Sequence, residues 1–146
     1  MLRGSIDLLD VNVWLALAVE AHTHPAPAQV YWQEEAAVTV AFCRLTHLAF
    51  LRHLTNKSIM GALTLAPPAA FAKGAEFLAL PEVTILAEPA GLDDALGGFC
   101  EKGPISPDWW RDASRAAFAK CAGVRPGTFG WGFWTLEGGD LLILKR

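Results

Sequence analysis

Short apolar stretches rich in β-branched residues alternate with stretches of helical character along most of this chain. The segments with strand character are 5–9, 37–42, 83–86 and 141–144. The segments that favour helices are 15–19, 25–32, 46–54, 67–78, 92–100 and 106–122. Strands that alternate with helices form βαβ units, whose strands run parallel and whose helices cover both faces of the sheet. The alternation therefore predicts an α/β fold, with a mostly parallel sheet of four to five strands between two helical layers.

The length of the chain suits one ordinary domain. It has 146 residues, of which 53% are hydrophobic and 18% charged, and a chain of this size buries about two-thirds of the surface that its unfolded form exposes. No apolar stretch approaches the roughly 18 residues that a membrane helix needs, and the first residues lack the apolar region of a secretory signal. We therefore expect a single domain over 1–146, located in the cytoplasm and without a membrane partner.

Charge and cysteine content exclude several kinds of site. The 12 basic and 15 acidic side chains give a net charge of -3, so any site for a polyanion must be local. Cys43, Cys100 and Cys121 are odd in number and far apart, which fits neither a disulfide framework nor a zinc site. We expect these three thiols to be reduced.

Polar side chains stand where predicted strands and helices meet. Asp10 directly follows the first strand, and Thr128 lies in a turn after the last long helix. In parallel sheets ligands gather at the carboxyl ends of the strands, which places Asp10, the loop before His47, the start of the 106–122 helix and the Thr128 turn around one cleft. Spacing alone leaves two roles open for Asp10, as a cap of the following helix or as a metal ligand.

Several stretches occur in an order and at a spacing typical of one family. They are LLDVNVW at 8–14, LTHLAFLR at 45–52, Asp112-Ala113 at the start of an alanine-rich stretch, and Thr128-Phe129. In these stretches the chain resembles the PIN-domain ribonucleases of the VapC toxin type, the toxin half of a bacterial toxin–antitoxin pair. The resemblance implies a PIN-like α/β/α sandwich that cuts RNA, with acidic side chains that hold Mg²⁺ or Mn²⁺ ions. It also implies a structured or transfer-type RNA (tRNA) as substrate and a cognate antitoxin as partner.

Only part of the family's acidic site carries over. Asp10 and Asp112 match two of its acidic positions, whereas His47 stands in place of the glutamate after Thr46 and Gly130 in place of the last aspartate. Hard divalent cations need oxygen ligands, and one or two such ions can activate water and shield a phosphoryl group. Two carboxylates leave a metal pair short of ligands, so we expect weak or single-ion binding.

Three hypotheses address the missing acids. His47 could supply a nitrogen ligand and shift the preference towards Mn²⁺ or another transition ion, although a lone histidine on an amphipathic helix more often packs between helices. Asp108 stands one turn before Asp112 and could replace a missing carboxylate, although an acid is also favoured there by the helix N-terminus. In the third hypothesis the site is degenerate, and the chain binds RNA or a partner without cutting.

Two further polar residues could orient water at the site. These are Thr46, at the start of the 46–54 helix, and Asn12, just after the first strand. Both residue types also cap helices, and the sequence does not decide between the two roles.

Basic and aromatic side chains suggest where RNA could bind. One basic cluster comprises Arg44, Arg52, His53 and Lys57, and another comprises Arg111, Arg115 and Lys120, with Trp109 and Trp110 adjacent. Such mixtures suit single-stranded RNA, although charges on a helix face are commonly only solvated. The aromatic segment 129–134 and the apolar composition suit a homodimer or a bound antitoxin segment.

The sequence thus predicts a metal-dependent endoribonuclease, the toxin of a VapBC-type pair, with an incomplete acidic quartet. Asp10 and Asp112 are its expected catalytic and metal-binding residues, and Thr46 and Asn12 are its expected water-orienting residues. The alternative is a catalytically degenerate PIN domain that acts as an RNA-binding or antitoxin-binding module.

Overall fold

The computed structural model describes residues 6–19, 27–101, 103–129 and 142–143. The strands of this part of the chain form one parallel sheet in the order β3-β2-β1-β4-β5. Their bounds are Ile6–Leu9 (β1), Thr39–Cys43 (β2), Val83–Leu86 (β3), Arg125–Thr128 (β4) and Leu142–Ile143 (β5). The predicted α/β fold with a mostly parallel sheet of four to five strands is confirmed.

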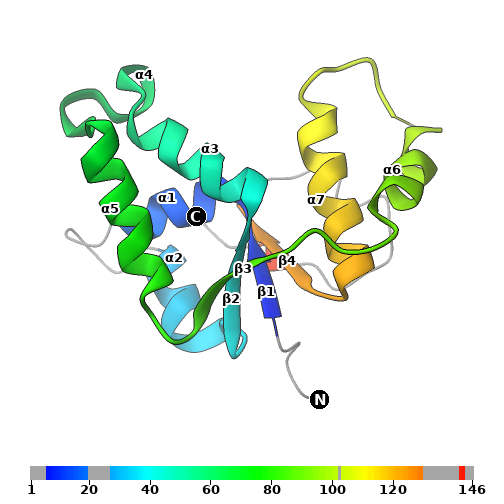
Figure 1. Ribbon diagram of the computed structural model, residues 1–146, viewed down its shortest axis with the longest axis horizontal. Helices are drawn as coiled ribbons and strands as arrows, with labels where there is room; N and C mark the ends of the chain where they lie inside the picture. Colours follow the sequence, from blue (N-terminus) through cyan, green and yellow to red (C-terminus); the bar gives the residue numbers. More distant parts are fainter. Residues whose placement is uncertain (1–5, 20–26, 102, 130–141, 144–146) are drawn as a thin grey trace.

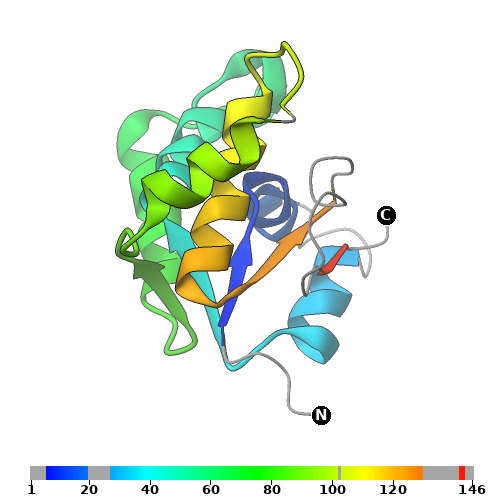
Figure 2. The same cartoon turned by 90° about the vertical axis from the view of Figure 1, so that its right-hand side faces the viewer.

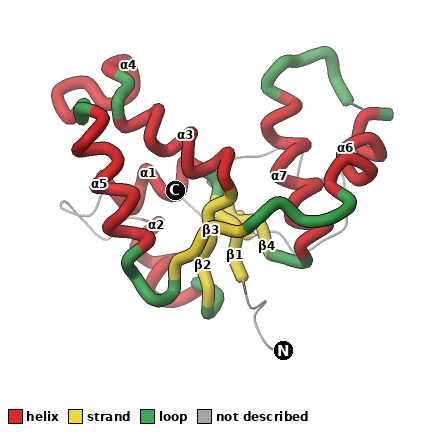
Figure 3. The backbone as a smooth tube through the Cα atoms, viewed as in Figure 1, coloured by secondary structure: helices red, strands yellow, loops and turns green. Residues whose placement is uncertain are grey.

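Helices cover both faces of this sheet. They are α1 (Val11–Val19), α2 (Pro27–Val30) with the π-helical η2 (Tyr31–Glu35), α3 (Arg44–Leu54), α4 (Lys57–Met60), the 3-10 helix η3 (Gly61–Leu63), α5 (Pro67–Leu78), α6 (Leu92–Cys100) and α7 (Trp109–Ala122). Figure 1 shows α1, α3 and α5 on one side of the sheet and α6 and α7 on the other. The strands lie between these two groups (Figure 3), which makes the molecule a three-layer sandwich.

The two helical layers bury different kinds of core. On the α1–α3–α5 side the core is aromatic, and Trp14 stacks on Phe42 with ring centroids 3.9 Å apart. On the other side α6 and α7 pack through Phe99 and Trp109, next to the small side chain of Ala113. Helix α7 packs on the sheet through Phe118, which lies in one buried cluster with Leu8 of β1 and Cys43 of β2, and this packing matters because α7 carries part of the site.

The order of the strands sets the position of the site. From β1 the chain adds β2 and then β3 on one side, and it returns to place β4 and then β5 on the other side of β1. Figure 2 shows β4 between β1 and β5. Neighbouring connections diverge at the carboxyl ends of β1 and β4, and such switch points form the ligand-binding crevice of α/β sheets.

The structure corrects some sequence-based boundaries. The predicted 106–122 helix begins at Trp109, because Ser106 opens a tight turn in which its carbonyl accepts a hydrogen bond from the Trp109 amide at 3.3 Å. Its predicted end at Gly123 is confirmed, and this glycine has φ 68°, in the left-handed region. Strand β4 was not among the predicted elements.

The described part of the chain also bears on the predictions about membrane helices and cysteines. No helix there is long and apolar enough to cross a membrane. All three cysteines are free, with Cys43 buried and Cys100 exposed.

Candidate active site

Asp10 lies at the carboxyl end of β1 and is buried, with 8% of its surface exposed. Its Oδ1 accepts a hydrogen bond from the Val11 amide at 2.7 Å, at the first residue of α1. Its Oδ2 accepts a hydrogen bond from the Thr128 hydroxyl, at the end of β4, at 3.0 Å. One carboxylate oxygen thus faces the start of a helix, and the other faces the switch point.

Asp112 comes to the same place from the first turn of α7. Arg115, one turn further along α7, donates from its Nη2 to Asp112 Oδ1 at 2.7 Å and to Asp10 Oδ2 at 3.3 Å. Arg115 is itself buried, with 7% of its surface exposed. The structure therefore brings the two carboxylates together on one guanidinium nitrogen.

The surroundings of Asp112 act on the pKa of its carboxyl in opposite directions. Burial raises the pKa of this carboxyl, and the nearby charges of Asp10 and Asp108 add to that effect. Arg115 and Arg111 lower the pKa in turn, but the net direction is upward. Asp112 therefore takes up a proton more readily than an ordinary aspartate does.

These residues do not fit a metal pair as they stand. The place that a cation would occupy between Asp10 and Asp112 is taken by the Arg115 guanidinium. Nowhere in the described ranges is there a group of three or more His, Cys, Asp or Glu side chains placed to hold an ion. Gly130, at the position of the family's last aspartate, lies outside the described residues.

His47 is not brought to the two carboxylates. Its ring packs edge-on to Phe42 at 5.6 Å, and its Nδ1 lies 3.1 Å from Nη1 of Arg44. Its Nε2 points at Gly74 of α5. The contact is close, because a Cβ atom built at Gly74 would lie only 3.5 Å from this nitrogen. Burial lowers the pKa of His47, and Arg44 lowers it further, so the ring is a neutral packing group between α3 and α5.

The other proposed site residues occupy three different environments. Asp108 is exposed at the start of α7 and lies close enough to raise the pKa of Asp112. The Thr46 hydroxyl accepts from the Cys43 amide at 2.9 Å and donates to the Cys43 carbonyl at 3.0 Å, which caps α3. Asn12 has a buried Oδ1 without a hydrogen-bond partner among the described residues, and it lines a cleft of about 490 Å³ that Phe129 also lines.

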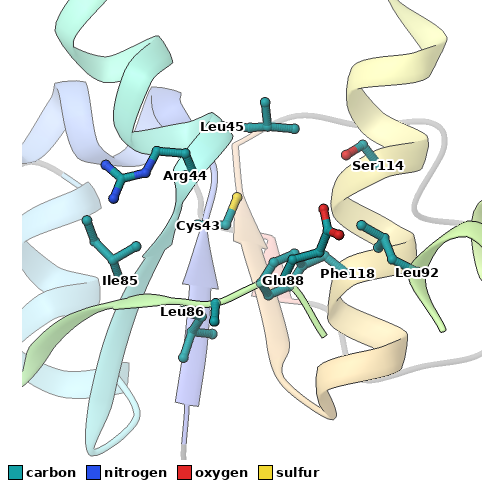
Figure 4. Close-up of a pocket in the computed structure, with 10 residues that line it drawn as sticks. Cys43, Arg44, Leu45, Ile85, Leu86, Glu88, Leu92, Ser114 and Phe118 are labelled. Carbon is teal, nitrogen blue, oxygen red and sulfur yellow. The ribbon is translucent and has the colours of Figure 1, made fainter. Parts of the chain in front are cut away.

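A second pocket, of about 390 Å³, opens between the carboxyl ends of β2 and β3 and helix α7. Figure 4 shows the polar side chains that line it, with the apolar Leu86 and Phe118 around them; the polar residues are Cys43, Arg44, Glu88 and Ser114. Sequence reasoning did not single out this pocket. The available signal was position, because Cys43 directly follows a predicted strand and Ser114 follows Asp112 by two residues.

The predicted RNA-binding clusters are only partly at the surface. Arg115 and Trp109 were expected beside RNA, but both are buried, Arg115 by the two carboxylates and Trp109 against α6. Other members of the clusters are exposed: Arg44, Arg52, Lys57, Trp110, Arg111 and Lys120. Burial lowers the pKa of His53 on α3, and both Arg52 and Arg111 of α7 lower it further. The charges of Arg52 on α3 and Arg111 on α7 therefore both reach His53, and Figure 1 shows these two helices on opposite sides of the sheet.

Solved structures share this fold. They include VapBC2 from Rickettsia felis bound to a DNA fragment from their promoter, with a TM-score of 0.68, 14% identity and coverage of 96% of this chain and 99% of that one. VapC20 of Mycobacterium tuberculosis, a Sarcin-Ricin loop cleaving toxin, has a TM-score of 0.64 at 15% identity and covers 95% and 99%. The sheet order and these matches define the class, an α/β fold of the PIN type.

Sequence similarity gives the family. Ribonuclease VapC41 of Mycobacterium tuberculosis is 34% identical over 145 residues, which span 95% of this chain and 99% of the relative. The chain matches none of the protein-family models against which it was compared. The extent and identity of the match to the ribonuclease show that this chain belongs to the VapC ribonuclease family.

Proposed function

We propose that this chain is an endoribonuclease that acts in the cytoplasm, where its RNA substrate is found, as the toxin of a VapBC-type pair. The observation that carries the proposal is the convergence of Asp10, Asp112 and Thr128 at the switch point of the sheet. It is supported by the names of its relatives, a ribonuclease and a toxin that cleaves the sarcin–ricin loop. Structured RNA, including tRNA, is the proposed substrate class.

The chain's own residues can perform two parts of phosphodiester hydrolysis. Asp112, with its raised pKa and partly exposed carboxyl, is the proposed acceptor of the proton from the attacking water. Asp10 is held rigidly by Thr128 and the Val11 amide, so it keeps the site in one geometry. Mg²⁺ or Mn²⁺ would supply charge shielding and an acidic water when bound. In this structure Arg115 fills the place between the two carboxylates, so the two roles above depend on the side chains of the chain itself.

The path of the RNA follows the exposed basic side chains. Arg52 on α3 and Arg111 on α7 lie on either side of the carboxyl ends of the strands and can hold phosphates of one strand. The 390 Å³ pocket beside α7 is large enough for a nucleobase, with Glu88 and Ser114 available to bond its edge.

An antitoxin and a second copy of the chain are the proposed protein partners. A toxin of the same fold was solved together with its antitoxin and promoter DNA. On α3 of this chain Leu45 is 63% exposed and Leu48, three residues further along the same helix, is 48% exposed. Large apolar side chains grouped on one surface favour a protein interface. The aromatic segment expected to join it, 130–134, lies outside the described residues.

Substitution of Asp10 tests the ribonuclease proposal. Asp10→Asn keeps the size of the side chain and removes its charge, so we expect RNA cleavage to be lost while the circular dichroism spectrum is retained. Asp94→Asn, on the exposed face of α6, is the matched control and should cleave like the wild type. Equal cleavage by wild type and Asp10→Asn would remove Asp10 from the mechanism.

The RNA-binding or antitoxin-binding module is the second candidate function. It is favoured by the salt links of Arg115, which tie up one oxygen of each carboxylate. In that case the wild-type chain binds RNA without cutting it at any concentration of Mg²⁺ or Mn²⁺, and Asp10→Asn binds RNA with the same affinity. Cleavage by the wild type that Asp10→Asn abolishes contradicts this alternative.

A further inference from the structure

We propose that Arg115 is the resident cation of the site and that a divalent ion can bind Asp10 and Asp112 only by displacing it. The inference concerns ion binding alone, so it holds or fails independently of whether the chain cuts RNA. It makes Arg115 a positioning residue that sets how strongly this site competes for Mg²⁺ or Mn²⁺.

The first argument is the position of the guanidinium. Its Nη2 lies 2.7 Å from Asp112 Oδ1 and 3.3 Å from Asp10 Oδ2. Asp112 and Arg115 are three residues apart on α7, where side chains at that spacing lie on one face. The helix therefore holds the arginine beside Asp112, and the packing of α7 on the sheet brings it to Asp10.

The second argument is charge. Asp10, Asp112 and Arg115 together carry about one negative charge, which attracts cations but is too small to hold two of them. Arg111 lies 3.9 Å from Asp112, but its side chain is 59% exposed, so solvent screens its contribution. Arg115 and Asp10 are both largely buried, with 8% and 10% of their side chains exposed, so water screens the repulsion between two cations poorly. An arriving ion and the guanidinium therefore exclude one another.

The third argument is that the arginine can leave. Arg115 Nε is buried and has no hydrogen-bond partner within the described part of the chain, although an arginine paired through its whole fork uses two nitrogens in parallel. Within the described part of the chain, a single nitrogen, Nη2, donates both hydrogen bonds to the two carboxylates. Because Nε takes no part in these hydrogen bonds, displacing the guanidinium costs less than it would for a bidentate pair.

Calorimetric titration with Mn²⁺ tests the proposal directly. Arg115→Met removes the cation but keeps an apolar side chain of similar length, so we expect it to bind Mn²⁺ at least about tenfold more tightly than the wild type. Added Mn²⁺ should also raise the melting temperature of the variant more than that of the wild type, because ligands stabilise the folded state that binds them. Arg111→Met is the matched control, since its exposed guanidinium lies 3.9 Å from the same Asp112 oxygen and should leave the affinity within about twofold of the wild type.

Two results would overturn the proposal. One is equal Mn²⁺ affinity in the wild type and Arg115→Met, and the other is tight binding that persists in Arg115→Met/Asp10→Asn, which would place the ion elsewhere. If Arg115→Met folds only when Mn²⁺ is present, that result supports the proposal.

The wild-type protein offers a test that needs no variant at Arg115. In a titration with diamagnetic Mg²⁺, the NMR signal of the Arg115 Nε–H group should shift in step with ion binding measured by calorimetry. Mg²⁺ binding that leaves this signal unmoved contradicts displacement. An absence of Mg²⁺ binding by the wild type supports the proposal only together with binding by Arg115→Met, and an absence in both contradicts it.

Discussion

Strand β1 has a buried aspartate near each end, and each meets an arginine from the far end of the sequence. Asp7 pairs with Arg125 near the amino end, and Asp10 meets Arg115 at the carboxyl end. The residue types are the same, yet the two pairs differ in how many acids share each arginine. That ratio separates the structural ion pair from the site at which we propose cation exchange.

The Asp7 pair is closed. Arg125 donates to Asp7 from Nε at 2.8 Å and from Nη2 at 2.9 Å, and the Ala37 amide and the Tyr31 hydroxyl donate to the same carboxylate. Burial raises the pKa of Tyr31, and its hydrogen bond to Asp7 raises it further, so the phenol stays a donor. One acid faces one arginine with each carboxylate oxygen bonded, and no charge is left over for a ligand.

The Asp10 pair is open. Its arginine is shared with Asp112, so two acids compete for one guanidinium. Asp112 is partly exposed, with 29% of its side chain reached by solvent. The comparison teaches that the proposed site differs from the structural ion pair in two ways: its arginine is shared by two acids, and one of those acids reaches solvent.

The largest expected effect is a loss of stability when the Asp7–Arg125 pair is broken. Asp7→Asn leaves Arg125 without its charge partner in a buried place, so unfolding free energy should fall by about 3–5 kcal/mol. Asp10→Asn leaves Arg115 paired with Asp112 and relieves repulsion between carboxylates, so its cost should be about 1 kcal/mol. Urea denaturation measures both, and equal losses in the two variants would erase the distinction.

A smaller loss of stability is expected from substitution of Thr128, whose hydroxyl donates a hydrogen bond to Asp10. Thr128→Val removes the hydroxyl that donates to Asp10 Oδ2 and should lower the unfolding free energy by about 1.5–3 kcal/mol. Thr128→Ser keeps the hydroxyl and is the control in the same thermal denaturation series. A loss in Thr128→Ser as large as that in Thr128→Val would show that the methyl group, rather than the hydrogen bond, matters.

The smallest effect concerns His47, which lies outside both pairs. Its folded-state pKa is lowered by burial and by Arg44, so below about pH 6.5 the unfolded chain takes up a proton that folded His47 resists. Stability should therefore fall as pH decreases from 7 towards 5. In His47→Asn this slope should be shallower, and His53→Asn should show a similar change because burial, Arg52 and Arg111 also lower the pKa of His53. An unchanged slope in both variants would contradict the prediction.

Much of the fold could be predicted because its signals are local. Apolar β-branched runs mark β2 and β3, and Gly123 marks the end of α7. Strand β4 could not be predicted in this way, because its sequence, Arg-Pro-Gly-Thr, has poor strand propensity. It is a strand because β1 and β5 pair with it on either side, and that is a tertiary effect.

The site shows the same limit. The position of Asp10 follows from the end of a predicted strand, and Asp112 could be chosen because it matches an acidic position of the family that the chain resembles. The role of Arg115 could not, since one helical turn from Asp112 also suits an exposed arginine, and only the packing of α7 against the sheet turns it inward. His47 illustrates the converse, because its identity suggests a ligand and its neighbours make it part of the core.

The direction of synthesis, from the N-terminus to the C-terminus, determines when the residues around Asp10 can come together. Asp10 is separated from Arg115 by 105 positions and from Thr128 by 118. Domains fold during translation from the N-terminus onward, so a nascent chain carries this carboxylate long before either side-chain partner has been synthesised. A product released before α7 is complete would hold no assembled centre, which keeps unfinished copies of the molecule inert.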